Sequence, residues 1–187
     1  CDINAISGNV ASYNTDSGIY IYYYCDNNTL SGNVISYNKW NGIYLESYCV
    51  YNTISGNNVS YNFRGLYFEE NIEDNTIWMN YISNNSQYQG ESDISSNWDN
   101  GTLGNYWGDF VERYPEATSS NGVWWDCEYE VDPGYNDTKP LVHPGYPEID
   151  SSGNVDYMID DGGNEISWTI TDATILDPHY WIYLDGI

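Results

Sequence analysis

The chain has 187 residues, and its 28 acidic and 4 basic side chains give a formal net charge of −24. Four basic residues cannot build the positive surface that binding to nucleic acid or to an anionic membrane requires, and no apolar run approaches the roughly 20 residues of a membrane span. With 21 Tyr and 8 Trp, the chain also carries too much aromatic surface to stay a solvated coil.

The first hundred residues repeat with a period of 24. Ser-Gly-Asn begins at positions 7, 31 and 55, and Ser-Tyr-Asn begins at 12, 36 and 60. The next step is one residue shorter, because Asn-Thr-Ile begins at 52 and again at 75. Each repeat contains three short segments of alternating apolar and polar residues, separated by Asn, Gly and Ser. This pattern predicts three short strands in each repeat.

Four repeat positions stay apolar and form columns. Strands this short are unstable alone, whereas stacking one repeat on the next buries every column at once. We therefore expect an all-β fold in which residues 1–97 form about four coils of a parallel β-helix, or solenoid, right-handed as parallel crossovers almost always are. Asn at the corners would tolerate left-handed backbone and bond to the Asn above and below. The columns expected to face inward are Ile6/Leu30/Ile54/Ile77, Ala11/Ile35/Val59/Ile82, Ile19/Ile43/Leu66 and Ile21/Leu45/Phe68.

The composition changes after the repeats, and all six Pro lie beyond residue 114. We expect residues 98–146 to form a C-terminal cap that covers the open end of the helix, with Trp124 and Trp125 as its apolar plug. Residues 147–187 contain alternating segments at 166–170 and 181–184, which predict a partial β-sandwich. A complete Ig-like sandwich needs about seven strands, so we expect the chain to be a piece of a longer protein.

Residues 52–62 (Asn-Thr-Ile-Ser-Gly-Asn-Asn-Val-Ser-Tyr-Asn) and the following Gly65-Leu66-Tyr67-Phe68 resemble the NosD-type right-handed β-helix repeat. Residues 97–110 and 137–141 are similar to the closing segments of such helices. The resemblance implies either a NosD-like copper-processing role, in copper delivery to nitrous oxide reductase, or a place among archaeal cell-surface and surface-layer proteins that share the repeat. The end of the chain is similar to the first strands of Ig-like or fibronectin-like modules in such proteins.

The cysteines and the other soft side chains are candidate copper ligands. Copper favours clusters of His, Met or Cys. Cys1, Cys25 and Cys49 share one repeat position, which Ile72 fills in the fourth coil, and Cys127 lies apart. The three are interpreted as a column of small buried side chains, with a disulfide between neighbouring coils or a soft-metal site as alternatives. Because the remaining candidates are scattered, we do not expect a copper site; they are His143, His179, Met79 and Met158.

One acidic stretch is a candidate calcium site. Four carboxylates alternate in sequence and could converge in a loop as oxygen ligands for Ca²⁺. The alternative is the solvated face of a strand whose other face carries Cys127, Tyr129 and Val131. The four candidate ligands are Asp126, Glu128, Glu130 and Asp132.

Tyrosines form two further columns. The Gly-Ile-Tyr-Ile alternation places Tyr20, Tyr44 and Tyr67 on the outer face, where they would suit stacking against sugar rings or contact with another protein. The sequence does not orient the second column, which consists of Tyr13, Tyr37 and Tyr61.

Two function classes remain after these exclusions. A non-catalytic extracellular module, serving as a surface scaffold or as an adhesion or carbohydrate-binding element, fits the acidic composition, and its partners would be glycans or other surface proteins. A polysaccharide-active enzyme is the alternative, because Glu46 and Glu69 lie at nearby repeat positions and a glycoside hydrolase needs two carboxylates about 5–9 Å apart. A lyase would need Arg64 or Lys39 beside an Asp cluster, which is missing. Glycosylation at the cell surface is expected at one or more of Asn27, Asn58, Asn84, Asn100 and Asn136.

Overall fold

The computed structural model describes residues 1–69, 71–92, 96–143, 148–149 and 170–171. It divides into two compact units, Cys1–Gly145 and Tyr146–Ile187. The described residues are nearly all strand, turn or loop, with one short helix, α1 (Phe110–Arg113). This helix of the described residues is not long and apolar enough to cross a membrane.

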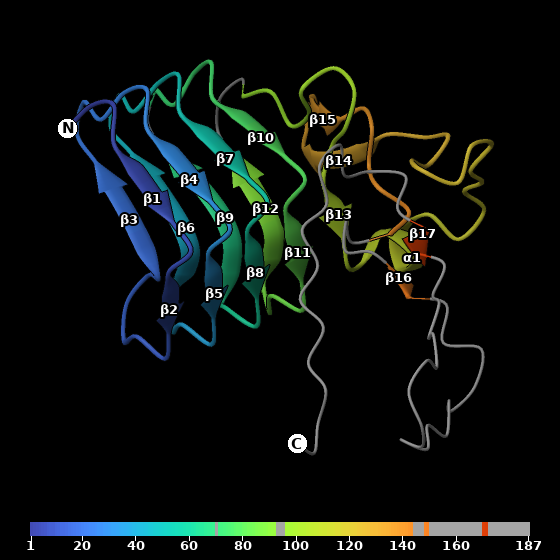
Figure 1. The fold of residues 1–187 in the computed structure, drawn as a ribbon, viewed down its shortest axis with the longest axis horizontal. Coiled ribbons are helices and arrows are strands. Elements are labelled where there is room, and N and C mark those ends of the chain that lie inside the picture. Colours follow the sequence, from blue (N-terminus) through green and yellow to red (C-terminus); the bar gives the residue numbers. More distant parts are fainter. Residues whose placement is uncertain (70, 93–95, 144–147, 150–169, 172–187) are drawn as a thin grey trace, which may run out of the picture. The chain divides into compact units, whose positions relative to one another are not determined.

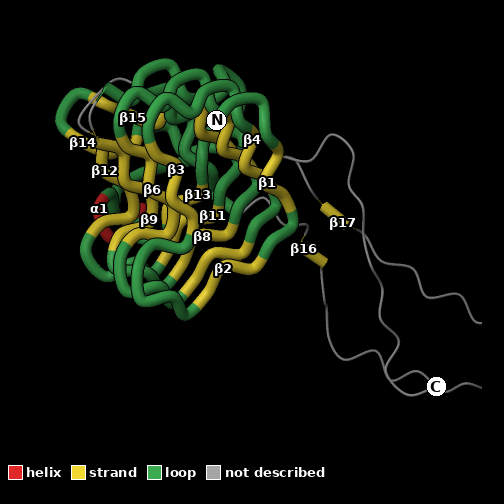
Figure 2. Tube along the Cα trace, turned by 90° about the vertical axis from the view of Figure 1, so that its left-hand side faces the viewer, coloured by secondary structure: helices red, strands yellow, loops and turns green. Residues whose placement is uncertain are grey.

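The first unit is a parallel β-solenoid built from three sheets, as predicted (Figure 1). The first sheet has the order β1 (Ala5–Ser7), β4 (Thr29–Ser31), β7 (Thr53–Ser55) and β10 (Thr76–Trp78). The second has the order β13 (Tyr106–Trp107), β11 (Tyr81–Ser83), β8 (Asn58–Ser60), β5 (Val34–Ser36) and β2 (Val10–Ser12). The third has the order β12 (Tyr88–Ser92), β9 (Arg64–Glu69), β6 (Asn41–Glu46) and β3 (Ile19–Tyr22). Successive coils lie one behind another with their strands in register (Figure 2).

The predicted apolar columns form the core. From the second coil onward their members are essentially inaccessible, with Leu30, Ile43 and Ile54 all at 0% exposure. Their counterparts in the first coil, such as Ile6 and Ile19, are only partly buried because no coil covers them in the structure. Burial of four columns by stacking therefore explains why strands of three to six residues are stable here.

The corners of the coils differ from the prediction in one respect. The inward-facing corner Asn residues do not take left-handed backbone; the residue just before each of them does, except before Asn105. Tyr37 before Asn38 has φ 57°, and Gly32 before Asn33 has φ 62°. The left-handed residue turns the chain outward, which leaves the following Asn free to point its amide into the coil.

Three ladders of stacked asparagines run along the helix. Each Asn except the last of its ladder donates its backbone N–H and its side-chain amide to the Oδ1 atom of the Asn one coil later, at 2.7–3.2 Å. This confirms the expected bonding between Asn residues of neighbouring coils. The ladders are Asn4/Asn28/Asn52/Asn75, Asn9/Asn33/Asn57/Asn80/Asn105 and Asn14/Asn38/Asn62/Asn85.

Residues 98–143, which we call the closing segment, pack against the last coil. Trp98 stacks on Phe68 at 5.4 Å, and Trp98 and Trp107 are each 1% exposed. The predicted plug was therefore placed on the wrong tryptophans, since Trp124 and Trp125 are only half-buried. Trp98 and Trp107 take that place because the chain passes directly from the last coil into them. The segment also contains the antiparallel pair β14 (Tyr129–Asp132) and β15 (Tyr135–Asp137).

In the second unit, β16 (Glu148–Ile149) pairs antiparallel with β17 (Ile170–Thr171). The rest of the predicted partial β-sandwich, over 147–187, lies outside the described residues.

Candidate functional site

The outer face of the third sheet carries the first tyrosine column, as predicted. Tyr20 stacks on Tyr44 with ring centroids 4.7 Å apart, and Tyr44 stacks on Tyr67 at 5.2 Å. Tyr20 is 51% exposed, while Tyr44 and Tyr67 are half-buried. The tyrosines are partners in the sheet register, so the parallel strand spacing of about 4.8 Å sets their stacking distance.

The two candidate catalytic carboxylates lie on the same face. Glu46 and Glu69 are register partners on β6 and β9, so the structure brings them to neighbouring positions. Tyr20 donates its hydroxyl to Glu46, and Tyr44 donates its hydroxyl to Glu69 at 2.6 Å. Burial and these acceptors raise the pKa of Tyr44 far above its usual value. Each carboxylate therefore holds a tyrosine hydroxyl.

The stacking limits what this column can bind. A sugar ring stacks on the open face of an aromatic ring, but the faces between Tyr20, Tyr44 and Tyr67 are turned toward one another. At the far end, the guanidinium carbon of Arg64 lies 4.3 Å from the centroid of Tyr67. Burial raises the pKa of Tyr67 to about 12. The column presents mainly ring edges and hydroxyls to solvent. The second tyrosine column, Tyr13, Tyr37 and Tyr61, is exposed and stacked in the same manner.

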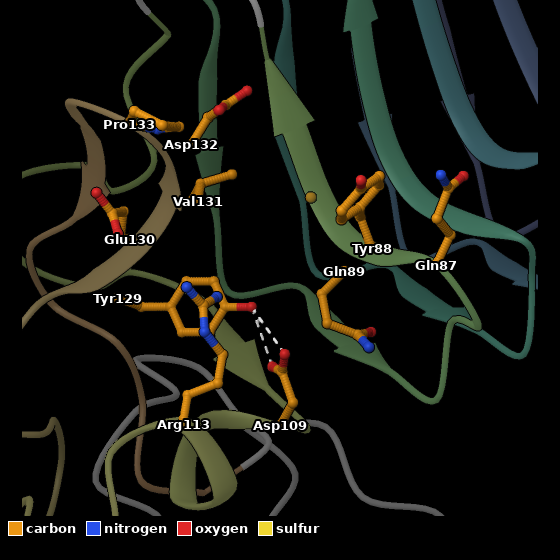
Figure 3. A pocket seen from close by; sticks show the side chains of 11 residues that line it. Gln87, Tyr88, Gln89, Asp109, Arg113, Tyr129, Glu130, Val131, Asp132 and Pro133 are labelled. Carbon is orange, nitrogen blue, oxygen red and sulfur yellow. Dashed lines mark hydrogen bonds between the residues drawn. The ribbon is translucent and has the colours of Figure 1, made fainter.

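A pocket of about 380 Å³ lies where the third sheet meets the closing segment (Figure 3). The last coil contributes β12 to one side of it, and α1 and β14 contribute the other. The lining combines an exposed aromatic ring, a guanidinium group, amides and carboxylates, so it is rich in polar groups. Its lining includes Gln87, Tyr88, Asp109, Arg113, Glu130 and Asp132.

A stack of three planar groups supports the floor of this pocket. Tyr129 lies with its ring parallel to that of Trp107 at 4.2 Å, and the guanidinium carbon of Arg113 is 4.4 Å from the Tyr129 centroid. The Tyr129 hydroxyl donates to Asp109 at 3.0 Å, shown by the dashed lines in Figure 3. Burial raises the pKa of Tyr129 far above its usual value. The phenol thus stays protonated and fixes the Asp109 carboxylate.

The four acids of the candidate calcium site do not converge. Asp126 accepts hydrogen bonds from Ser120 and Thr118, and Glu128 accepts one from Asn136. Only Glu130 and Asp132 reach a common pocket. No group of three or more His, Cys, Asp or Glu side chains that could hold a metal ion occurs among the residues that the structure describes.

The cysteine column forms as the repeat register predicts. Cys25 and Cys49 are buried at 3% and 0% exposure, and Ile72 continues their column at 1%. Cys1 is exposed, with its Sγ 2.7 Å from Sγ of Cys25, and all four cysteines are free thiols. Burial raises the pKa of Cys49 to about 11.

The candidate glycosylation sites divide into two groups. Asn27, Asn84 and Asn100 are exposed at turns or loops. Asn58 is half-buried within β8, and Asn136 is half-buried within β15, where its amide donates to Glu128 at 2.7 Å.

The repeat architecture agrees with a comparison of family profiles. Residues 1–112, more than half of the chain, match the family described as "Periplasmic copper-binding protein (NosD)". The chain belongs to the NosD family. This description places the family in the periplasm, which is compatible with a location outside the cytoplasm. No curated protein and no solved structure gives a significant match to the chain.

The donor chemistry of this NosD-family chain does not fit a copper site. Cys1 and Cys25 bring two thiols together, but no group of three or more His, Cys, Asp or Glu side chains that could hold a metal ion occurs among the described residues. Met79 occupies a left-handed corner, and His143 lies in the closing segment, away from the thiols in sequence. Met158 and His179 lie outside the described residues.

The pocket beside β12 was not predicted from the sequence. A signal for it exists, because the fourth coil replaces the Gly-Ile-Tyr-Ile pattern of the third sheet with Gln-Gly-Glu-Ser at 89–92. The loss of the repeat pattern in this strand indicates that the fourth coil packs against a segment outside the repeats. Gly90 takes the position of Leu66 in the register, and a Cβ atom there would lie 3.2 Å from the Trp107 ring. The sequence could not reveal which segment fills that space.

Proposed function

We propose that the chain is a non-catalytic module of an extracellular scaffold, and that it carries a carbohydrate-binding element at its surface. The rigid coil stack supplies the scaffold, because each coil is fixed to its neighbours by three asparagine ladders and four apolar columns. The net charge of −24 keeps such a surface soluble and suits bridging by cations. Placement at the cell surface is part of the proposal.

The observation that carries the non-catalytic assignment is the bonding of Glu46 and Glu69. A hydrolase needs one protonated and one ionised carboxyl group that face an open substrate site. Here each carboxylate accepts a hydrogen bond from a tyrosine hydroxyl, so one oxygen of each carboxylate is engaged by the tyrosine column. The two glutamates are therefore expected to act as anchors of the tyrosine column.

An enzyme remains the second candidate, favoured by one observation, the register pairing of Glu46 with Glu69 on adjacent strands. We do not propose the copper role of the family description for this chain.

The test is a glycan array screened with the purified chain, with release of reducing ends from the same polysaccharides measured in parallel. We expect binding to one class of glycan and no release. Reducing-end release that disappears in Glu46→Gln would favour the enzyme. A chain that binds no glycan in the array would leave the scaffold role without its carbohydrate-binding element.

A further inference from the structure

We infer that the pocket between β12 and the closing segment binds one ring of a neutral, hydroxyl-rich sugar, such as the terminal residue of a glycan. This inference rests on the proposed carbohydrate-binding role and names its site and ligand class.

Tyr88 supplies an aromatic ring that is not stacked against another ring. Its ring is 47% exposed, lines the pocket and forms no stacked pair with any ring in the described residues. Tyr88 takes the register position of Arg64, so it lies one coil beyond the point where the guanidinium closes the column. In Figure 3 it stands at the β12 side of the pocket, opposite β14. An amphipathic ring in this position suits the apolar face of a pyranose.

The polar groups of the pocket include both hydrogen-bond donors and acceptors, which suits the hydroxyl groups of a sugar. A hydroxyl both donates and accepts a hydrogen bond, so a polyol needs donors and acceptors side by side. Arg113 offers donors and makes no ion pair with any described residue. The Glu130 carboxylate is exposed and accepts no hydrogen bond from the described part of the chain. Among the described residues, Asp132 accepts one bond, at 3.4 Å from the Ser92 N–H.

The negative charge of the pocket lining disfavours binding of an acidic sugar. Asp109, Glu130 and Asp132 outnumber the single guanidinium of Arg113 in the lining, within a chain of net charge −24. A uronate or a sulfated sugar would be repelled. A calcium ion would need six to eight oxygen ligands at 2.3–2.6 Å, and the described acids form no group able to hold a metal.

The pocket wall is already ordered before a ligand arrives. Tyr129 is fixed between Trp107 and Arg113, and its hydroxyl holds Asp109. Gly90 lacks a Cβ atom, which lets Val131 and Trp107 close against β12. Such preorganisation reduces the entropy lost on binding. The Arg113 donors and the Asp109 acceptor are therefore held at fixed positions around the space beside Tyr88.

The experiment is an NMR titration of the full chain with methyl glycosides of glucose, galactose, mannose and N-acetylglucosamine. Glucuronate and Ca²⁺ are titrated separately. Tyr88→Ala removes the open ring and Glu130→Gln weakens one acceptor. Tyr20→Ala is the matched control, since Tyr20 is similarly exposed but belongs to the stacked column and does not line the pocket. Thermal melting of each variant monitors folding.

We expect a neutral glycoside to shift resonances of the pocket residues, and we expect affinity to fall at least tenfold in Tyr88→Ala while Tyr20→Ala keeps it. Affinity that survives Tyr88→Ala but falls in Tyr20→Ala would overturn the pocket and leave the proposed function standing. Tighter binding of glucuronate or Ca²⁺ in the pocket would overturn the ligand class. If neither the glycosides nor the array glycans bind the wild type, the pocket and the carbohydrate-binding role fail together.

Discussion

Asn105 donates its backbone N–H to Oδ2 of Asp137 at 2.7 Å and its side-chain amide to the same oxygen at 3.3 Å. This contact ends the second asparagine ladder. An Asn at the last position would present an unpaired amide to the closing segment, whereas a carboxylate only accepts. Trp107 Nε1 and the Lys139 N–H also donate to Asp137, at 2.8 and 2.9 Å. The third ladder ends similarly on the Gln89 carbonyl, 2.9 Å from the Asn85 amide.

Asp137 should make the stability of the fold depend on pH. Burial raises its pKa to about 7, against the lowering effect of its hydrogen bonds. The folded state then binds a proton that the unfolded state releases near pH 4, so the free energy of unfolding falls as pH rises from about 4 to 7. The slope from this group is at most about 1.4 kcal/mol per pH unit. Denaturant unfolding at several pH values measures it.

Asp137→Asn is the control for this prediction. Repulsion among the other acids also destabilises the fold as pH rises, so the difference between the two pH profiles isolates Asp137. Parallel profiles for the wild type and the variant would show that Asp137 does not titrate in this window.

Alanine substitutions at Gly42 and Gly32 distinguish the cost of a steric clash from the cost of backbone strain. A Cβ atom at Gly42 would lie 2.3 Å from Val59 Cγ1 and 2.8 Å from the Gly65 oxygen. Gly32 has open space but φ 62°, so Gly32→Ala should cost only about 1–2 kcal/mol. We expect Gly42→Ala to cost clearly more, because two coils must separate. Equal midpoints in urea would contradict the close approach at Gly42.

The asparagine ladder predicts unequal effects at two neighbouring residues. Asn57 is 1% exposed, and its Oδ1 accepts both donors of Asn33. Asn57→Ala leaves these donors unpaired inside the coil, at a cost of about 3 kcal/mol or more. Asn58 is half-buried, and in the described part of the chain its side chain accepts only from Ser60, so Asn58→Ala should cost less than about 1 kcal/mol. Chemical unfolding of both variants tests this difference, and a mild effect at Asn57 would show that the ladder contributes little.

Thiol labelling reports the integrity of the coil stack. Cys1 and Cys127 are exposed, and Cys25 and Cys49 are buried. We expect an alkylating reagent to modify the first pair in the native protein and all four in denaturant, as counted by mass spectrometry. Because burial raises the pKa of Cys127 as well, its labelling should accelerate at alkaline pH. Rapid native labelling of Cys49 would mean that the coils open readily.

The sequence predicted the repeat part of the fold well because periodicity carries it directly. Columns such as Leu30 and Ile54 recur at a fixed spacing, and only stacking can bury them together. The tyrosine column followed from the same register. The closing segment has no period, so its partners depend on tertiary contacts, and the burial of Trp98 and Trp107 could not be separated from that of Trp124 and Trp125. The pocket combines β12 with residues about twenty or more positions later, which spacing alone does not bring together.

The measurement that most directly tests the account is a mass spectrum of the glycan recovered after prolonged incubation with the chain. The glycan is the one that binds best in the array, and binding is followed on the same sample. We predict that it binds and is recovered intact, because Glu46 and Glu69 hold tyrosine hydroxyls. Fragments that appear with the wild type and are absent with a Glu46→Gln/Glu69→Gln variant would contradict the account and assign the third sheet to catalysis.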